Sequence, residues 1–227
     1  MKSASRLPII LILIGFICLP GLLGADIAPL QVEGGSPAAK SKHETIRMES
    51  EEVNVRLEKR SYTVDAVFDF MNTGETATEW VGFPKQDKQY FSRGEHESPR
   101  FTQFHVWVNG KKILFPQEDK WWIAGQVTFP GNAKTTIRVM YEAGYRRGQY
   151  ATYVIGTGAP WKGKLARAAF TVDGSGIGGT DKFTAHISGS KGHRMVSKNA
   201  VRIVLKDYEP NGRLSIDLFR RSIWYRD

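Results

Sequence analysis

The feature that most constrains this fold is a period of two in its apolar residues. In its clearest stretch, every second residue is apolar: Tyr62, Val64, Ala66, Phe68 and Phe70. Successive side chains of a β-strand point to opposite faces of a sheet, so the alternation places all of these residues on one face. No stretch keeps the period of 3.6 residues that an amphipathic helix needs. The sequence therefore predicts a protein built of strands.

The remaining strands are separated by residues that favour turns. Asn109-Gly110 predicts a tight hairpin, because both residues tolerate positive φ. Pro130-Gly131-Asn132 predicts a second hairpin, Pro84 is expected to end a strand, and residues 174–179 are interpreted as a hairpin connector. Short strands divided by turns are typical of an antiparallel β-sandwich. The expected strands, besides 62–70, are residues 53–57, 76–83, 103–108, 113–115, 121–129, 135–141, 151–155, 168–173, 183–188, 201–205 and 214–219.

The N-terminus has the order of a secretory signal peptide. Lys2 and Arg6 precede an uncharged, strongly apolar stretch over residues 7–25, which ends in small residues. This predicts a signal peptide over residues 1–25 and export to the periplasm or the extracellular space. The alternative is a membrane-anchored protein that retains residues 7–25 in the bilayer.

The rest of the chain divides by composition. Residues 26–44 are small, polar and without periodicity, so we predict a flexible arm. Residues 45–145 are predicted to form a first β-sandwich lobe, and residues 146–227 a second β lobe or a continuation of the same sandwich. The single cysteine, Cys18, leaves with the leader if it is cleaved. The mature chain would then depend on its apolar core and not on disulfides.

Several segments resemble a known family. An acidic segment leads into a strand that ends in Phe-x-Asn, and an aliphatic-x-Phe-Pro segment follows. Together they resemble the bacterial exported family known as domain of unknown function 4424, over about residues 46–173. The resemblance implies an exported β protein and brings no catalytic residue with it. It rests on Ile46-Arg47-Met48-Glu49-Ser50-Glu51, Phe68, Phe70, Asn72-Thr73-Gly74, Val81-Gly82-Phe83-Pro84, Val108-Asn109-Gly110, Pro130-Gly131, Tyr141 and Thr157-Gly158-Ala159-Pro160-Trp161-Lys162-Gly163.

Motifs that carry chemistry are missing from the sequence. The Gly-x-Ser-x-Gly motif of a nucleophilic serine does not occur, and a mature chain without cysteine cannot form a Cys-His pair. The five histidines show no spacing typical of metal ligands. We therefore expect no catalytic residue, no metal and no cofactor, and we interpret the chain as a protein that is not an enzyme.

An acidic segment, Glu49, Glu51 and Glu52, is the most suggestive polar feature, and its role stays open at this point. On a regular strand Glu49 and Glu51 would share one face. We favour a solvated strand edge whose charges oppose aggregation. The alternative is an envelope hydrolase in which this segment works with Asp65 or Asp69 as a pair of carboxylates.

Exposed aromatic and basic residues are the best candidates for binding. Trp107 falls on the polar face of its strand, and Trp121 and Trp122 are adjacent, so their side chains point to opposite faces. Arg146 and Arg147 form a basic pair suited to an anion. The net charge of +9 favours an anionic envelope component or another protein as partner. No motif for binding nucleic acid occurs, so none is expected as a partner.

The sequence as a whole predicts an exported, non-catalytic β-sandwich protein. Its expected role is that of a binding or structural module of the bacterial cell envelope.

Overall fold

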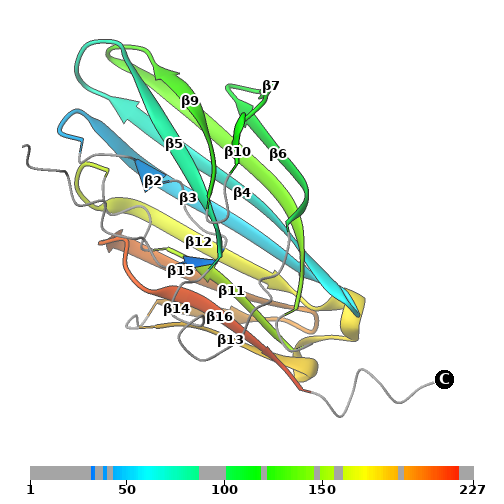
Figure 1. Ribbon diagram of the computed structural model, residues 1–227. Helices are drawn as coiled ribbons and strands as arrows, with labels where there is room; N and C mark the ends of the chain where they lie inside the picture. The colour runs from blue at the N-terminus through cyan, green and yellow to red at the C-terminus, as the bar shows by residue number, and fades with distance from the viewer. Residues whose placement is uncertain are drawn as a thin grey trace, which may run out of the picture.

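The large sheet of the molecule has eight strands. In spatial order these are β14, β15, β12, β3, β4, β10, β6 and β7. Figure 1 shows the middle strands running diagonally as one broad, twisted layer. Their bounds are β3 (Ile46–Leu57), β4 (Ser61–Asn72), β6 (Thr102–Val108), β7 (Lys111–Ile113), β10 (Ala133–Gly144), β12 (Leu165–Asp173), β14 (His193–Val196) and β15 (Ala200–Tyr208).

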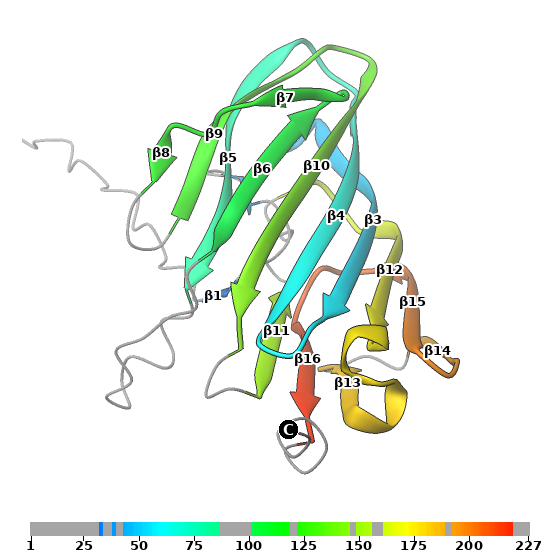
Figure 2. The ribbon, with the colours of Figure 1, turned by 90° about the vertical axis from the view of Figure 1, so that its right-hand side faces the viewer.

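Two smaller sheets lie side by side on one face of the large sheet and form a second layer. Figure 2 shows β5, β8 and β9 standing beside β6 and β10 as part of that layer. One small sheet contains β1 (Val32–Glu33), β2 (Ala38–Ala39), β5 (Ala77–Gln86), β8 (Gln117–Glu118) and β9 (Trp122–Phe129). The other contains β11 (Tyr150–Val154), β13 (Phe183–Ile187) and β16 (Arg213–Leu218). The predicted all-β sandwich is therefore confirmed.

The computed structural model describes most of the chain. The predicted signal peptide, residues 1–25, lies outside the described residues, as does most of the predicted arm, residues 26–44. The described residues are 32–33, 38–39, 43–86, 101–118, 122–145, 149–155, 161–188 and 192–219. Among them, no helix has the length and apolar character needed to cross a membrane.

The core lies between the large sheet and the second layer. Along β4 every second side chain is buried, as the alternation predicted. Phe68 packs against Phe83 of β5, with ring centroids 6.2 Å apart, and Phe70 packs edge-on against Phe129 of β9 at 5.4 Å. Burial of aromatic rings of this size is the main source of stability in such a fold. We call the face of the large sheet that carries these residues the inner face, and the opposite one the outer face.

The connections from β4 to β5 and from β9 to β10 are corners between the layers and not hairpins. β4 belongs to the large sheet and β5 to the second layer, and β9 and β10 are divided in the same way. The predicted hairpin at residues 130–132 is therefore wrong: the chain changes sheet there. Buried Asn72 stabilises the corners, since its amide donates to the carbonyl oxygens of Glu75 and Phe129 at 2.6 and 3.0 Å. The Phe-x-Asn segment thus ends a strand and ties two corners together.

Two further turn predictions also need correction. β5 does not end at Pro84 but continues to Gln86. β2 pairs with Val81 and Gly82, and β1 pairs with Lys85 and Gln86, so neither pairs with Pro84. The N–H that Pro84 lacks is therefore not needed for the pairing of β5 with β1 or β2. Residues 174–179 do not form a hairpin connector, because β12 and β13 lie in different sheets; two short 3-10 turns, Ser175–Ile177 and Thr180–Lys182, occupy this connection.

The Asn109-Gly110 hairpin is confirmed. Both residues have positive φ, 49° and 79°, and Val108 pairs directly with Lys111 across the turn. The side chain of Asn109 also accepts a hydrogen bond from the Thr136 amide, 2.8 Å away. The hairpin is therefore fixed to β10, which positions the side chains of β7.

The large sheet contains strands from both predicted lobes, residues 45–145 and residues 146–227. β12 runs parallel to β3, with Phe170 opposite Val53, whereas the other strand pairs are antiparallel. Parallel neighbours need a long connection, and here the whole segment between β3 and β12 provides it.

Candidate functional site

Trp107 lies on the outer face of the large sheet, between two basic side chains. It stands opposite Arg138 of β10 and opposite Lys112 of β7 in the strand register. The guanidinium carbon of Arg138 is 5.2 Å from the centre of the indole ring, and the Lys112 ammonium nitrogen is 5.9 Å away. Cations within about 6 Å of an indole are attracted by its electron-rich face. We call Trp107, Lys112 and Arg138 the Trp107 cluster.

Arg138 is fixed in place from its other side. Its Nε and one terminal nitrogen donate to the two carboxylate oxygens of Asp65, at 2.8 and 2.6 Å. These hydrogen bonds, together with the negative charge of Asp65, raise the pKa of Arg138. The guanidinium therefore stays charged, and its plane is held by a two-point contact. Arg138 thus orients the indole, while its charge is largely offset by Asp65.

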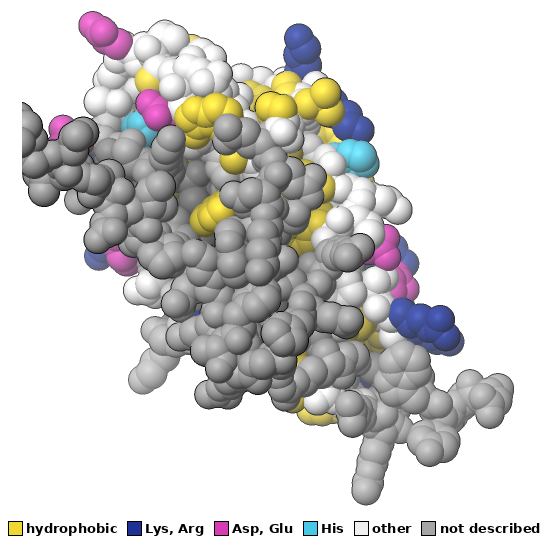
Figure 3. Space-filling view, viewed as in Figure 1, with side chains coloured by type: hydrophobic (Ala, Val, Ile, Leu, Met, Phe, Trp, Pro, Cys, Tyr) yellow, Lys and Arg dark blue, Asp and Glu magenta, His cyan; other side chains and the backbone are white. Residues whose placement is uncertain are grey.

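The lysines of the hairpin are held less firmly. Lys111 and Lys112 are exposed, and within the described residues neither forms an ion pair. Leu114, just beyond β7, is 86% exposed. Figure 3 shows hydrophobic side chains beside basic ones at the upper edge of the molecule, near β6 and β7. This end of the sheet therefore combines free positive charge with apolar and aromatic surface.

Trp122, another predicted binding residue, does not join this cluster. Trp122 lies on the side of β9 that faces away from the large sheet, so it is on the opposite outer surface of the sandwich from Trp107. Its ring covers Gly82, where a side-chain carbon would come within 3.0 Å of the indole. Trp121, Arg146 and Arg147 lie outside the described residues.

The acidic segment is not the solvated strand edge that we favoured from the sequence. β3 has β12 on one side and β4 on the other, so the segment does not form a sheet edge. The register shifts between Met48 and Ser50, which is a β-bulge at Glu49. An extra residue in a strand reverses the facing of the residues after it. Glu49 and Glu51 therefore do not share a face, contrary to the expectation for a regular strand.

The bulge turns Glu51 to the inner face. Its side chain is fully buried and accepts a hydrogen bond of 2.7 Å from the Tyr153 hydroxyl of β11. Tyr208 is also nearby: burial raises its pKa, and the charge of Glu51 adds to that rise. Glu51 therefore contributes to the contact between the large sheet and the three-stranded sheet.

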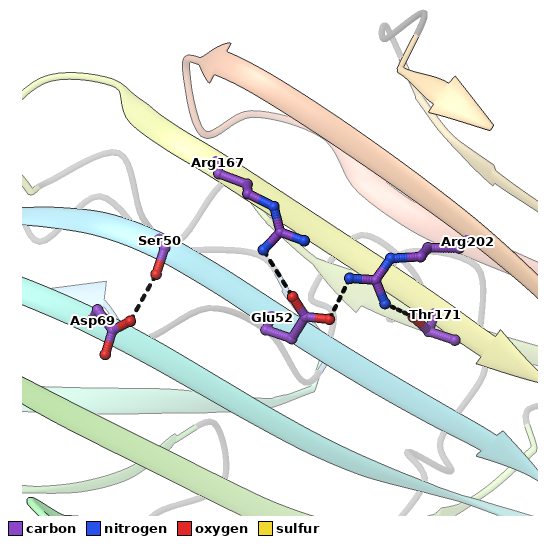
Figure 4. Close-up of polar contacts among 6 residues, drawn as sticks. All are labelled: Ser50, Glu52, Asp69, Arg167, Thr171 and Arg202. Atoms are coloured by element: carbon purple, nitrogen blue, oxygen red, sulfur yellow. Dashed lines mark hydrogen bonds and ion pairs between the residues drawn. The ribbon is translucent and has the colours of Figure 1, made fainter. Parts of the chain in front are cut away.

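The outer-face acids are each engaged by neighbours. Glu52 accepts from Arg167 at 2.9 Å and from Arg202 at 2.7 Å, as Figure 4 shows. Asp69 accepts from the Ser50 hydroxyl at 2.9 Å. Because Asp65 and Asp69 lie on the outer face and Glu51 on the inner face, Glu51 cannot pair with either carboxylate.

The outer-face glutamates are each held by basic side chains. Glu52 points to the two arginines, and Glu49 is held by Arg47 at 2.6 Å and by Lys134 at 3.5 Å. The hydrogen bond from Arg47 lowers the pKa of Glu49, and the charge of Lys134 acts in the same direction. Across the described residues, no group of three or more His, Cys, Asp or Glu side chains is placed to hold a metal ion.

Sequence reasoning missed Lys112 and Arg138, and it named Asp65 only as a possible carboxylate of a hydrolase pair. Lys112 was open to prediction, since a two-residue Asn-Gly turn that pairs Val108 with Lys111 also pairs Trp107 with Lys112. The role of Arg138 was not, because its contacts with Trp107 and Asp65 depend on the order of β4, β10 and β6 in the sheet.

Comparison with known proteins shows the fold. No family model matches the chain, and no curated protein matches it. The chain is similar to the crystal structure of a "putative nutrient binding protein" from Legionella pneumophila, with 19% sequence identity, a TM-score of 0.58, and coverage of 82% of this chain and 70% of that one. A weaker likeness is to the M1 zinc metallopeptidase of Deinococcus radiodurans, with 8% identity, a TM-score of 0.43, and coverage of 78% and 43%. The first likeness supports the sandwich architecture, and the second carries no argument.

Proposed function

We propose that this chain is an exported, non-catalytic binding module of the bacterial cell envelope, and that the Trp107 cluster is its contact site. The proposed ligand is an anionic envelope component that contains sugar rings. Export is part of the proposal and rests on the leader sequence and on the resemblance to the exported family.

The carrying observation is the pair of cations that flank the Trp107 ring at 5.2 and 5.9 Å. An indole offers a flat apolar surface on which a sugar ring can stack. The charge of Arg138 is offset by Asp65, so Lys112 supplies the attraction for an acidic group. Since the outer-face acids are engaged by arginines or hydroxyls, the geometry favours binding over acid-base chemistry.

The nutrient-binding description of the Legionella structure is compatible with a binding role. The similarity supports the proposal only through the fold, because the sequence identity is low. The ligand class is therefore argued from the Trp107 cluster alone.

The proposal can be tested with three soluble polymers. Dextran sulfate carries both sugar rings and negative charge, neutral dextran carries only the rings, and polyglutamate carries only the charge. We expect the full chain to bind dextran sulfate more tightly than either of the others, and to lose affinity as salt is added.

Substitutions in the Trp107 cluster test whether dextran sulfate binds there. Trp107→Ala and Lys112→Gln should each weaken dextran sulfate binding by about tenfold, which corresponds to about 1.4 kcal/mol. Trp122→Ala, on the opposite outer surface, is the matched control and should bind as the parent does. Equal binding of all three polymers, or equal binding by the Lys112→Gln variant and the parent, would overturn the proposal.

A further inference from the structure

We propose that β14 is a docking edge for an extended, acidic segment of a partner protein. β14 ends the large sheet on the side opposite β7, and within the described residues it pairs only with β15. An incoming strand would extend the sheet by one member, a recurring mode of peptide recognition. This inference goes beyond the proposed ligand site, since Trp107 lies near the other end of the sheet.

The backbone of β14 presents usable groups on its outer side. The Ser197 amide donates to the carbonyl oxygen of Ala200 at 2.9 Å, so this pair is hydrogen-bonded at the start of the β14–β15 ladder. Bonded and non-bonded pairs alternate along an antiparallel ladder. Met195 therefore directs its N–H and C=O toward β15, whereas Arg194 and Val196 direct theirs away from it. These groups are a template for a further strand.

The side chains of β14 are unusually open. All four are exposed, including Met195 at 45% and Val196 at 61%. They lie on alternate faces of the strand, so an added strand with apolar residues could cover either one. Apolar residues at an unpaired edge are a feature that proteins commonly avoid, which favours a role in recognition.

The charge of the edge selects the partner. The segment from residue 192 to residue 198 carries Arg194 and Lys198 and no acidic residue. Within the described residues neither of these two forms an ion pair. A second copy of β14 would bring the same positive charge, whereas an acidic strand would bring the opposite one. The edge therefore favours an acidic segment over self-association.

A capped peptide of alternating valine and glutamate serves as the probe, with lysine in place of glutamate as the matched control peptide. The full chain should bind the glutamate peptide at least about tenfold more tightly than the lysine peptide. Hydrogen exchange should slow at the amides of Arg194 and Val196 when the peptide binds.

Two variants separate the backbone from the charge. Val196→Pro removes an outward N–H while the pairing of Met195 with β15 remains, and it should weaken peptide binding by about tenfold. Arg194→Glu reverses an exposed charge and should weaken it to a similar degree. Lys111→Glu makes the same charge change at the opposite edge and serves as the control.

Three outcomes would overturn the inference. The first is equal binding of the two peptides, and the second is undiminished binding by both β14 variants. The third is self-association of the chain through this edge. The parent would then sediment as an oligomer and the Val196→Pro variant as a species of lower mass, and the occupant of the edge would be a second copy. Trp107→Ala should leave peptide binding unchanged. A failure of the β14 docking inference can therefore be told apart from a failure of the proposed ligand site at Trp107.

Discussion

Glu51 and Glu52 are neighbours in the sequence, but the two faces of β3 hold them in different ways. Glu51 is fully buried on the inner face and accepts a hydrogen bond from the Tyr153 hydroxyl of the second layer. Glu52 is one-third exposed on the outer face and is shared by two arginines of the same sheet. A hydrogen bond is stronger where the local dielectric is low, and surface ion pairs are weakened by water and salt. The inner contact therefore joins the layers, while the outer one mainly sets the pattern of surface charge.

The largest effect is expected on the inner face. Tyr153→Phe removes the hydroxyl that donates to buried Glu51 and should reduce the free energy of unfolding by about 1.5–3 kcal/mol. Urea denaturation monitored by tryptophan fluorescence measures the loss.

Tyr150 on the same strand provides a matched control. Tyr150 is exposed and its hydroxyl accepts a hydrogen bond from Gln149, so Tyr150→Phe should change stability by about 0.5 kcal/mol at most. If the two variants lose the same stability, the inner contact is no stronger than a surface one and the comparison fails.

An intermediate effect is expected at Glu52. Glu52→Gln removes the charge shared by Arg167 and Arg202 and should reduce stability by about 1 kcal/mol. The loss should shrink as salt is added, since the group is partly exposed. A double-mutant cycle with Arg202→Ala measures the coupling, and a coupling that does not depend on salt would contradict the surface character of this contact.

The smallest effect is expected at Glu49 and depends on pH. Its pKa in the folded protein is lowered from the ordinary value of 4.5, chiefly by the hydrogen bond from Arg47. The resulting stability is fully present above the ordinary pKa and is lost as the pH falls through the lowered one.

Glu49→Gln removes this contribution. The variant should be less stable than the parent by about 0.5 kcal/mol near neutral pH, and the difference should disappear below the folded-state pKa. Thermal unfolding over a series of acidic buffers tests this. A stability difference between parent and variant that grows toward low pH would contradict the lowered pKa of Glu49.

The sequence largely predicts which side chains of each strand face the core. A period of two in the apolar residues assigns each side chain to one face of its strand, whatever the order of strands in the sheet. The β4 pattern and the Asn109-Gly110 hairpin follow from local rules alone. The bulge at Glu49 does not, since one extra residue leaves no mark in composition. This is why Glu51 was expected beside Glu49 and is instead on the inner face.

The order of strands was also beyond local reasoning. A corner between layers and a hairpin use the same turn residues, so Pro130-Gly131-Asn132 could not distinguish them. The contact of Trp107 with Arg138 requires that β6 lie beside β10, which is a property of the complete sheet. Sequence reasoning therefore found the aromatic residue of the candidate site but not the guanidinium that orients it.

The parallel pairing of β3 with β12 has a consequence for how fast the chain acquires its structure. Arg167 and Glu52, which meet across this pair, are 115 positions apart, and Arg202 and Glu52 are 150 apart. Contacts between such distant positions require the closure of large loops, and proteins rich in them fold slowly. Until β12 arrives, one side of β3 lacks its partner, and other unfinished chains can attach there. We therefore expect the pairing of β3 with β12 to form late in folding and to be the step most open to error.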